Sequence, residues 1–356
     1  MSKKLKVGLI GLGGIMTSAH MKGYKRMEDI IEIAAICDIL PEKLEAFKKA
    51  FDMESVPSFT DYKELLCVED LDYVDICTPN YLHSVIAVDA LNRGLHVFCE
   101  KPDAVSVQEA LKMKAAAEKN DRHLMVMRNN RYRHTAQYLK KYIEEGKMGD
   151  IYCGRCGWQR RRGIPGKGGW FTTKEQSGGG PLIDLGVHMI DLSIWLMGNP
   201  TPVAVSGCAY TKFADNDVSD SVNSSFGDKK EDGIFDVEDL AMGFIRFDNG
   251  ACLQIEFSWA SNVEKETIFV ELRGDKAGAE LKDGILKIFT ENDGVLEDIH
   301  PRLTDTSQIH GDNIKHFANV LKKNAKPDFT PEQGVNMIKI LEAMYRSAET
   351  GMEVRL

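Results

Sequence analysis

The sequence has no apolar run that approaches the ~18 residues needed to cross a bilayer, which excludes a membrane-spanning protein. It also lacks a block of lysine and arginine, and its formal net charge is -9. An acidic chain of this kind repels nucleic acid and anionic lipid, so neither is an expected partner. The apolar share of 43% and the charged share of 28% are those of an ordinary soluble globular protein.

Cysteine is present without the pattern of a disulfide framework. Cys37, Cys77 and Cys99 each end a β-branched or aromatic run, which is typical of buried strand thiols. The single CxxC, at 153–156, has neither the partners of a zinc site nor the setting of a thioredoxin motif. Residues 3–16 mimic a signal peptide but contain four glycines and lack an A-x-A-like cleavage site. We therefore expect a cytoplasmic protein with reduced thiols.

The length of 356 residues predicts two domains, because one domain spans roughly 150 residues. The first third of the chain alternates short apolar strands with helices of ordinary length. Strands separated in this way form right-handed crossovers and a parallel, doubly wound sheet. We place this α/β domain at residues 1–127.

The pattern changes after residue 127. Strand-like runs follow one another, with strong turn sequences at Asp248-Asn249-Gly250 and Asp283-Gly284. The runs lie at 202–211, 237–247, 251–260, 266–273 and 285–290. We expect a mainly antiparallel sheet with helices on one face, in a second α+β domain at 128–356. Residues 213–232 are polar and aperiodic, which predicts a long loop.

A glycine cluster follows the first strand directly and opens a helix. Gly11, Gly13, Gly14 and Ile15 stand where backbone N–H groups can approach a pyrophosphate at a helix N-terminus. Asp38 ends the second strand, where a carboxylate can bind the adenosine ribose diol and repel a 2′-phosphate. The pattern therefore favours NAD over NADP. Its third position holds Met instead of Gly or Ala, so the helix is expected to stand slightly further from the strand.

Two further segments lie at strand ends, where open parallel sheets bind their ligands. Thr78-Pro79-Asn80 follows one strand and Glu100-Lys101-Pro102 follows the next. Proline fixes the backbone in both segments, which suits a rigid loop facing a ligand. Lys101 is either a solvated surface lysine or a functional group beside the expected nicotinamide, and its position favours function.

The second glycine cluster, Gly178–Gly180, precedes a helix over 182–197 that is apolar nearly all round and therefore buried. Asp184, His188 and Asp191 follow at i, i+4 and i+7, on one face of this helix. A buried charge destabilises the fold unless it is paired or has a functional role. Asp184 can orient His188 and raise its basicity, as a general base requires. Two other interpretations of this stripe stay open. His188 could be a core histidine whose hydrogen bonds are made within the protein, or the three side chains could form a metal-binding face.

Aromatic and basic side chains flank the loop before this helix. Trp158 and Trp170 could stack on a ring of the substrate or pack in the core. Arg160 begins a run of three arginines that could bind an anionic group on a substrate or could end a strand in solvent.

Together these segments resemble the Gfo/Idh/MocA family of oxidoreductases, which includes inositol dehydrogenases and glucose–fructose oxidoreductase. The resemblance covers the whole chain and is most specific in EKP at 100–102 and in DLGVH at 184–188. It rests on GLGGIMTSAH at 11–20, CTPNYLHSVIAVDAL at 77–91, GLHVFCEKP at 94–102, GGGPLIDLGVHMIDLSIWLMG at 178–198 and VEDLAMGFIRFDNG at 237–250.

The resemblance implies a Rossmann domain, an open α/β domain whose sheet often forms the oligomer interface, and a set of site residues. Lys101, Asp184 and His188 would form the catalytic group. Asn129 and Arg131 match a segment that reaches toward the nicotinamide or the substrate. The residues placed near the cofactor are Thr78, Asn80, His83 and Glu100.

The residues and the resemblance predict an NAD-dependent oxidoreductase that transfers hydride between nicotinamide and a secondary alcohol of a sugar, glycoside or cyclitol. His188 would take the hydroxyl proton, Asp184 would orient it, and Lys101 would stabilise charge on the same oxygen. One alternative is glycoside cleavage or epimerisation with NAD recycled in place. Others are an NAD-binding regulatory protein without chemistry and a metal-dependent enzyme built on Asp184, His188 and Asp191. A homodimer or homotetramer through the C-terminal sheet is expected.

Overall fold

The computed structural model of the chain describes residues 3–227, 229–304 and 306–356. The chain divides into two compact units, Met1–Met127 with Gln308–Val335 and Arg128–Ser307 with Asn336–Leu356. The sequence assigns residues 308–335 to the second domain, whereas here they pack with the first unit. The reason is a close approach between two helices. α9 (Ile309–Leu321) lies against α1 (Met21–Lys25), and a Cβ at Gly23 would be 2.6 Å from Gly311 Cα.

The first unit is built on a six-stranded sheet in the order β3-β2-β1-β4-β5-β6. All neighbouring strands pair in parallel. This order is that of the doubly wound dinucleotide-binding fold and confirms the predicted fold class. The strands are β1 (Leu5–Ile10), β2 (Ile31–Cys37), β3 (Ser58–Phe59), β4 (Tyr73–Ile76), β5 (His96–Cys99) and β6 (Leu124–Val126).

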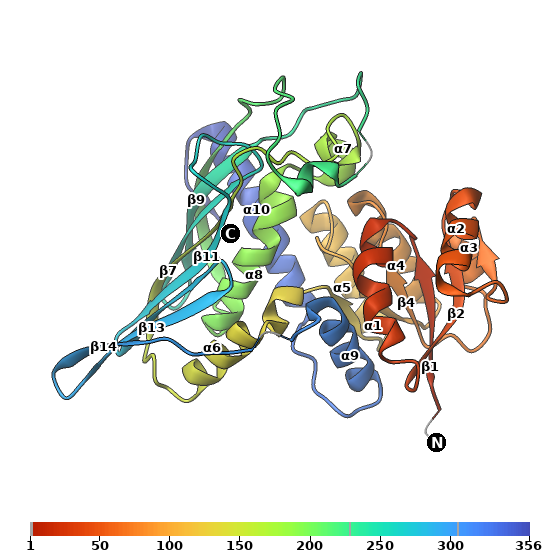
Figure 1. Cartoon of the computed structure of the whole chain (residues 1–356), viewed down its shortest axis with the longest axis horizontal. Coiled ribbons are helices and arrows are strands. Elements are labelled where there is room, and N and C mark those ends of the chain that lie inside the picture. Colours follow the sequence, from red (N-terminus) through yellow and green to blue (C-terminus); the bar gives the residue numbers. More distant parts are fainter. Residues whose placement is uncertain (1–2, 228, 305) are drawn as a thin grey trace. The chain divides into compact units, whose positions relative to one another are not determined.

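Helices flank this sheet, as Figure 1 shows for α1, α2 and α4. α2 (Pro41–Phe51) begins with proline in its first turn and ends at Asp52 in the left-handed region. α5 (Val107–Asn120) begins after Ser106, whose side chain accepts the Glu109 N–H and so caps the helix. The remaining helical elements of this unit are the π-helix η1 (Met16–His20), the 3-10 turn η2 (Asn80–Leu82), α3 (Tyr62–Leu65) and α4 (His83–Asn92).

The second unit holds a nine-stranded sheet in the order β14-β13-β12-β11-β7-β10-β9-β8-β15. Only β7 and β10 pair in parallel among these described strands, so the sheet is mainly antiparallel as predicted. The strands are β7 (Ile151–Gln159), β8 (Pro202–Tyr210), β9 (Leu240–Phe247), β10 (Cys252–Ser258), β11 (Thr267–Gly274), β12 (Ala277–Lys282), β13 (Ile285–Asn292), β14 (Val295–Ile299) and β15 (Val354–Arg355).

The five runs predicted from sequence match β8, β9, β10, β11 and β13, and they do not include β7, β12, β14 and β15. β14 is exposed along nearly its whole length, so it has no apolar alternation to detect. Residues 213–232, apart from 228, form an irregular segment with one 3-10 turn, η6 (Val222–Ser225), in agreement with the predicted loop.

The two faces of the nine-stranded sheet differ in chemistry. Helix α8 (Val187–Leu196) packs against β7 and β11 on one face of the sheet (Figure 1). This face carries the buried apolar side chains. The other face carries charged and polar side chains from the same strands. The remaining helical elements are η3 (Asn129–Tyr132), α6 (His134–Glu144), η4 (Trp170–Thr172), α7 (Lys174–Ser177), the π-helix η5 (Leu182–Gly186) and α10 (Pro331–Thr350), which runs from the first unit into the second.

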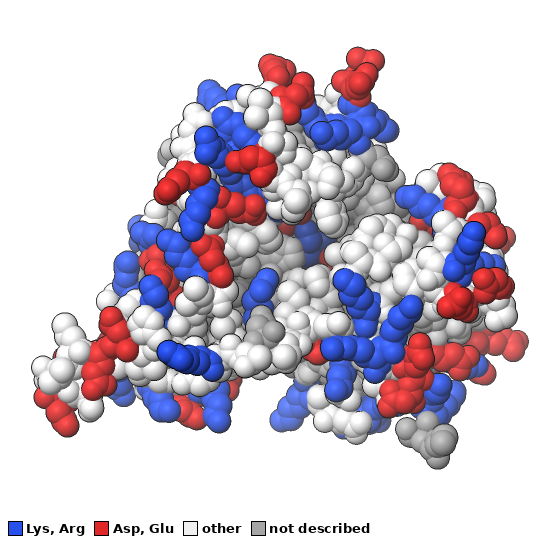
Figure 2. Space-filling view, in the orientation of Figure 1, with Lys and Arg blue, Asp and Glu red and all other residues white. Residues whose placement is uncertain are grey.

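Among the described residues, no helix has both the length and the apolar character that crossing a membrane requires. On the face visible in Figure 2, lysine and arginine side chains are interspersed with aspartate and glutamate.

Candidate functional site

The first glycine cluster forms the turn between β1 and η1. Gly11 adopts a positive φ of 88°, and its N–H donates to Cys37 O at 2.8 Å. A Cβ on Gly11 would lie 2.6 Å from Cys77 O, so both the conformation and the space require glycine there. The turn therefore brings the ends of β1, β2 and β4 together, where ligands of such sheets bind.

The other two glycines of the cluster face open space. A Cβ on Gly13 or Gly14 would meet no atom within 4 Å, so packing within the protein does not require glycine at either position. The space over their backbone is of the kind that a dinucleotide pyrophosphate occupies, at the N-terminal end of a helix. Met16, at the third position of the motif, is fully buried, and the helix opens with a widened π turn over Met16–His20. This turn accommodates the larger side chain.

Asp38 lies at the end of β2 and ties the glycine turn to the next loop. Its carboxylate accepts the Leu12 N–H at 2.9 Å and the Leu40 N–H at 3.0 Å, and the residue is 8% exposed. Ile39 and Leu40 follow it and are exposed. A carboxylate at this strand end, without a cation beside it in these positions, suits a ribose diol better than a phosphate.

His83 connects the two strand-end loops. Nδ1 lies 2.8 Å from Pro102 O and Nε2 lies 2.9 Å from Thr78 O, and burial lowers the pKa of the ring. The ring is fully buried and joins the loops, whereas direct contact with a cofactor stays a prediction. Thr78 Oγ1 is buried and has no hydrogen-bond partner among the described residues. Such an orphaned hydroxyl fits a site that a polar ligand completes.

A buried ionic cluster under these loops was not anticipated from sequence. His20 Nδ1 lies 2.7 Å from Asp75 Oδ2, His20 Nε2 lies 2.8 Å from Glu100 Oε1, and Tyr24 donates to Asp75 at 2.7 Å. Each ring nitrogen faces a carboxylate, so the ring is held as an imidazolium. Burial opposes that charge, but the Asp75 carboxylate outweighs it and raises the pKa of His20 well above its usual value.

The same cluster determines the pKa of the Glu100 carboxyl. Burial would raise the pKa of this carboxyl, but the hydrogen bond and charge of His20 hold the pKa well below its usual range. The Lys101 N–H donates to the other Glu100 oxygen at 3.1 Å. His20, Asp75 and Cys77 also have the donor types of a metal site. The distance of 2.7 Å between His20 Nδ1 and Asp75 Oδ2 is that of a direct N–H···O hydrogen bond. This distance favours an ion pair over a metal site.

In the second unit, Gly178–Gly180 form the turn that precedes η5 and α8. A side chain on Gly180 would clash with the Glu238 backbone oxygen, and one on Gly179 would clash with the Tyr345 hydroxyl. The buried Glu238 carboxylate accepts the Gly180 N–H at 2.9 Å and the Leu182 N–H at 3.0 Å, and Tyr345 donates to it at 3.0 Å. Glu238 thus binds the free N–H groups at the start of this helical segment.

Asp184 lies in the π-helical turn η5, and His188 lies in the first turn of α8. Asp184 Oδ2 accepts the indole N–H of Trp259, which is fully buried, at 3.0 Å. The His188 ring lies 6.1 Å from the Trp158 ring, measured between centroids. An oriented carboxylate and an imidazole one helical turn apart have the composition of an acid–base pair.

Asp191, the third polar residue of the stripe, has a different role. Arg131 donates to both of its oxygens, at 2.8 and 2.6 Å, and Arg128 Nε lies 2.9 Å from Oδ1. Both arginines are buried. This pairing uses the Asp191 carboxylate, which leaves Asp184 and His188 as the candidate functional pair. It also gives Arg131 a structural role, and its expected contact with substrate stays a prediction.

The aromatic and basic residues flanking the loop are organised around Glu266. Trp158 donates to Glu266 Oε1 at 2.7 Å, Arg160 Nε lies 3.3 Å from the same oxygen, and the Arg160 guanidinium lies 5.2 Å from the Trp158 ring centroid. Arg160 is 5% exposed, so it is a packed member of this group. Trp170 stacks on Phe171 with ring centroids 3.8 Å apart. Contacts of these residues with substrate stay predictions.

Asn129 begins η3, the turn that follows the first unit, and is buried. Ile15 immediately precedes η1, at the end of the glycine turn. Their expected contacts with the cofactor stay predictions, as does that of Asn80, which begins η2 after β4 and is 8% exposed.

Two family models match the chain. One is described as an oxidoreductase family with an NAD-binding Rossmann fold and matches residues 5–128. The other is described as an oxidoreductase family C-terminal alpha/beta domain and matches residues 140–356.

Curated relatives and a solved structure agree with these matches. The chain is 33% identical over 356 residues to D-glucoside 3-dehydrogenase of Escherichia coli strain K12, covering 100% of this chain and 98% of the relative. It is 32% identical over 288 residues to levoglucosan dehydrogenase of Pseudarthrobacter phenanthrenivorans, covering 76% and 72%. A structure of levoglucosan dehydrogenase in complex with NADH and levoglucosan superposes with a TM-score of 0.84 at 25% identity, covering 99% of each chain.

Proposed function

Because this chain belongs to the Gfo/Idh/MocA oxidoreductases, with an NAD-binding Rossmann domain and a C-terminal alpha/beta domain, we propose that it oxidises a secondary alcohol of a sugar, glycoside or cyclitol with NAD. The observation that carries the proposal is the Trp259–Asp184 hydrogen bond on the segment that presents His188. A half-buried carboxylate that is held in one position by a buried indole is placed to orient a neighbouring imidazole.

The proposed chemistry removes a proton from the hydroxyl and a hydride from its carbon. His188 takes the hydroxyl proton, Asp184 orients the imidazole, and Lys101 donates a hydrogen bond to the same oxygen as negative charge develops on it. When bound, NAD would supply the acceptor for the hydride. The C–H and O–H bonds break, a C=O bond forms, and the products are a ketone, NADH and a proton on His188.

We propose D-glucosides as the first substrate class to test. The support is the relative named D-glucoside 3-dehydrogenase, which matches this chain over its full length. Levoglucosan dehydrogenase, the second relative, acts by its name on an anhydro sugar in which the anomeric carbon is also substituted. A closed anomeric centre with a free secondary hydroxyl is common to both substrate types.

The proposed cofactor is NAD, with NADP less favoured. Asp38 supports this preference, because its carboxylate is fixed at the end of β2 by Leu12 and Leu40 and would repel a 2′-phosphate. Open space at Gly13 and Gly14 supports the binding of a dinucleotide in the first unit, as does the Thr78 hydroxyl, which has no hydrogen-bond partner within the described part of the chain.

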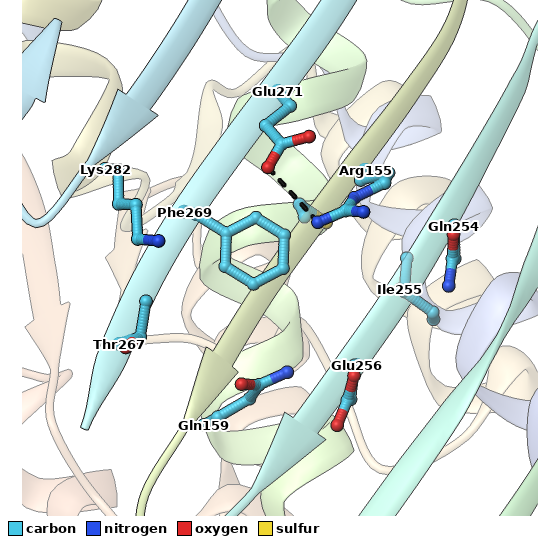
Figure 3. A pocket seen from close by; sticks show the side chains of 10 residues that line it. Arg155, Gln159, Gln254, Ile255, Glu256, Thr267, Phe269, Glu271 and Lys282 are labelled. Carbon is cyan, nitrogen blue, oxygen red and sulfur yellow. Dashed lines mark hydrogen bonds and ion pairs between the residues drawn. The ribbon is translucent and has the colours of Figure 1, made fainter. Parts of the chain in front are cut away.

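We further propose a homodimer or homotetramer formed through the C-terminal sheet. On its polar face, Arg155, Glu256, Glu271 and Lys282 surround a hollow of about 260 Å³ (Figure 3). Arg155 and Glu271 form an ion pair at 3.2 Å, and Phe269 lies among these charges over Gly157. A face that carries both signs of charge around an aromatic ring can pair with its own copy about a twofold axis.

The eight cysteines are all free thiols. This supports a reducing compartment, and we propose the cytoplasm.

A screen of sugars, glycosides and polyols that follows NADH absorbance, run with NAD and with NADP, tests the proposed function. We expect net NADH accumulation with at least one glucoside. Glycoside cleavage or epimerisation with NAD recycled in place would consume substrate without net NADH. A protein that binds NAD and converts none of these compounds would contradict the proposal.

A further inference from the structure

A cavity of about 330 Å³ lies in the second unit between α8 and the strands β11 and β12. Its walls are mainly apolar and come from Trp158, Met189, Leu192, Ile268 and Leu281, with Arg133 at its edge. The Arg133 Nε–H donates to Asn130 Oδ1 at 2.8 Å, and the Asp283 carboxylate accepts the Ile268 N–H at 2.9 Å. The polar groups of the lining thus bind one another or the backbone, and an apolar surface is left for a ligand.

The cavity adjoins the proposed base. Trp158 forms part of its wall, and the Trp158 ring lies 6.1 Å from the His188 ring. Leu192 follows His188 by four residues, so the two side chains share a face of α8 about 6 Å apart along the helix axis. A substrate that presents a hydroxyl to His188 would therefore extend its far side toward Leu192.

The wall between His188 and the cavity is held in place. The Trp158 indole N–H donates to Glu266 at 2.7 Å, and the Arg160 guanidinium lies 5.2 Å from its ring centroid. A ring fixed on its edge and its face loses little freedom when a ligand packs against it.

We propose that this cavity is an aglycone subsite, which takes an apolar group of about one ring in size attached to the anomeric carbon of the glycoside. The inference rests on the proposed function, because it places the oxidised sugar carbon at His188. Pockets for small molecules span about 300 to 1,000 Å³, so this cavity suits a single ring. A second sugar is disfavoured, because its hydroxyls would face apolar walls without partners.

Burial of one aromatic ring in such a cavity raises affinity by about 10- to 30-fold. The test compares phenyl and methyl D-glucosides, each as both anomers, by calorimetric titration of the protein saturated with NADH. An alcohol binds to this complex without being oxidised, so the comparison does not depend on turnover. We expect phenyl glucoside to bind about 10- to 30-fold more tightly than methyl glucoside for at least one anomer.

Ile268→Trp fills the cavity from a partly exposed strand position. We expect it to reduce the phenyl-to-methyl preference below about threefold while the affinity for methyl glucoside stays within about twofold. Leu296→Trp, on the exposed strand β14, is the matched control and should leave the preference unchanged. If Ile268→Trp also lowers the affinity for methyl glucoside, Ile268→Ala provides the deciding comparison. In that variant the phenyl-to-methyl preference should fall by a few fold.

The proposed subsite is contradicted if the wild-type protein binds phenyl and methyl glucoside with nearly equal affinity. It is also contradicted if the wild-type phenyl-to-methyl preference is unchanged in both Ile268→Trp and Ile268→Ala. Absence of NADH formation from every glucoside would contradict the proposed function alone, because the binding ratio is measured without turnover.

Discussion

The indole N–H of Trp259 donates a hydrogen bond to Oδ2 of Asp184 at 3.0 Å, across 75 positions of sequence. Trp259 is fully buried just beyond the end of β10, and Asp184 lies in the π-helical turn before α8. The bond therefore fixes the carboxylate of the proposed acid–base pair against the sheet. Trp259 is a positioning residue, since it acts through Asp184.

Trp259→Phe keeps an aromatic ring and removes the donor. A hydrogen bond to a charged group contributes about 1.5–3 kcal/mol, so we expect kcat to fall by about 10- to 100-fold with KM within about twofold. Steady-state kinetics with the best glucoside measures the changes in kcat and KM separately. Trp195→Phe, on the same helix as His188, is the control and should change kcat little. Equal losses in the two variants would indicate packing damage and contradict the positioning role.

His20→Gln tests the buried ionic cluster of the first unit. Without the imidazolium, the Asp75 and Glu100 carboxylates are left buried and only partly paired, which costs about 3–5 kcal/mol. We expect the melting temperature to fall by roughly 10 °C or more. His300→Gln, at an exposed position, controls for the loss of a histidine. A His20 variant as stable as this control would show that the cluster carries no net stability.

Protonation of His96 should destabilise the fold at mildly acidic pH. Burial, aided by the neighbouring His123 and Arg122, lowers the pKa of His96 from 6.5 to about 4, and its Nδ1 accepts the His123 N–H at 2.9 Å. Because the pKa in the folded state is depressed, the stability from the neutral ring is present above about pH 6.5. It is lost as the pH falls toward 4.

His96→Asn keeps an acceptor for the His123 N–H and removes the titration. We expect its melting temperature to decline by a few degrees less than that of the wild type between pH 6.5 and 4. His300→Asn should follow the wild-type curve. Parallel curves for the wild type and His96→Asn would contradict the assignment.

Cofactor choice should depend on the strand end at Asp38. We expect Asp38→Ser with Ile39→Arg to shift the ratio of kcat/KM for NADP over NAD by about 100-fold, since repulsion is removed and a phosphate-binding cation is added. Ile39 is 77% exposed, so its replacement costs the fold little. Ile39→Arg alone should shift the ratio less. A wild-type preference for NADP would contradict the role of Asp38.

Sequence reasoning recovers the features that are local in the chain. The turn at Gly11, the carboxylate at the end of β2 and the glycine-flanked helix that carries His188 each depend on neighbours within a few positions, which periodicity and turn chemistry describe. The doubly wound sheet follows from alternation of short strands and helices.

The partners that hold these groups are distant in sequence and could not be anticipated. Glu238 lies 58 positions from Gly180, and Glu100 lies 80 positions from His20. Which side chains meet depends on strand order and register in the folded sheets, which one sequence does not specify. The packing of α9 with the first unit has the same cause, because it depends on contact between Gly23 and Gly311 across the unit.

The most direct test of the central claim is the rate of NADH formation from glucoside by His188→Ala, with NAD affinity measured by titration on the same protein. General-base catalysis contributes about 10²- to 10⁴-fold, so we expect a loss of that size in kcat with the NAD dissociation constant within about twofold. Wild-type kcat in His188→Ala would contradict the assignment of His188 as the base.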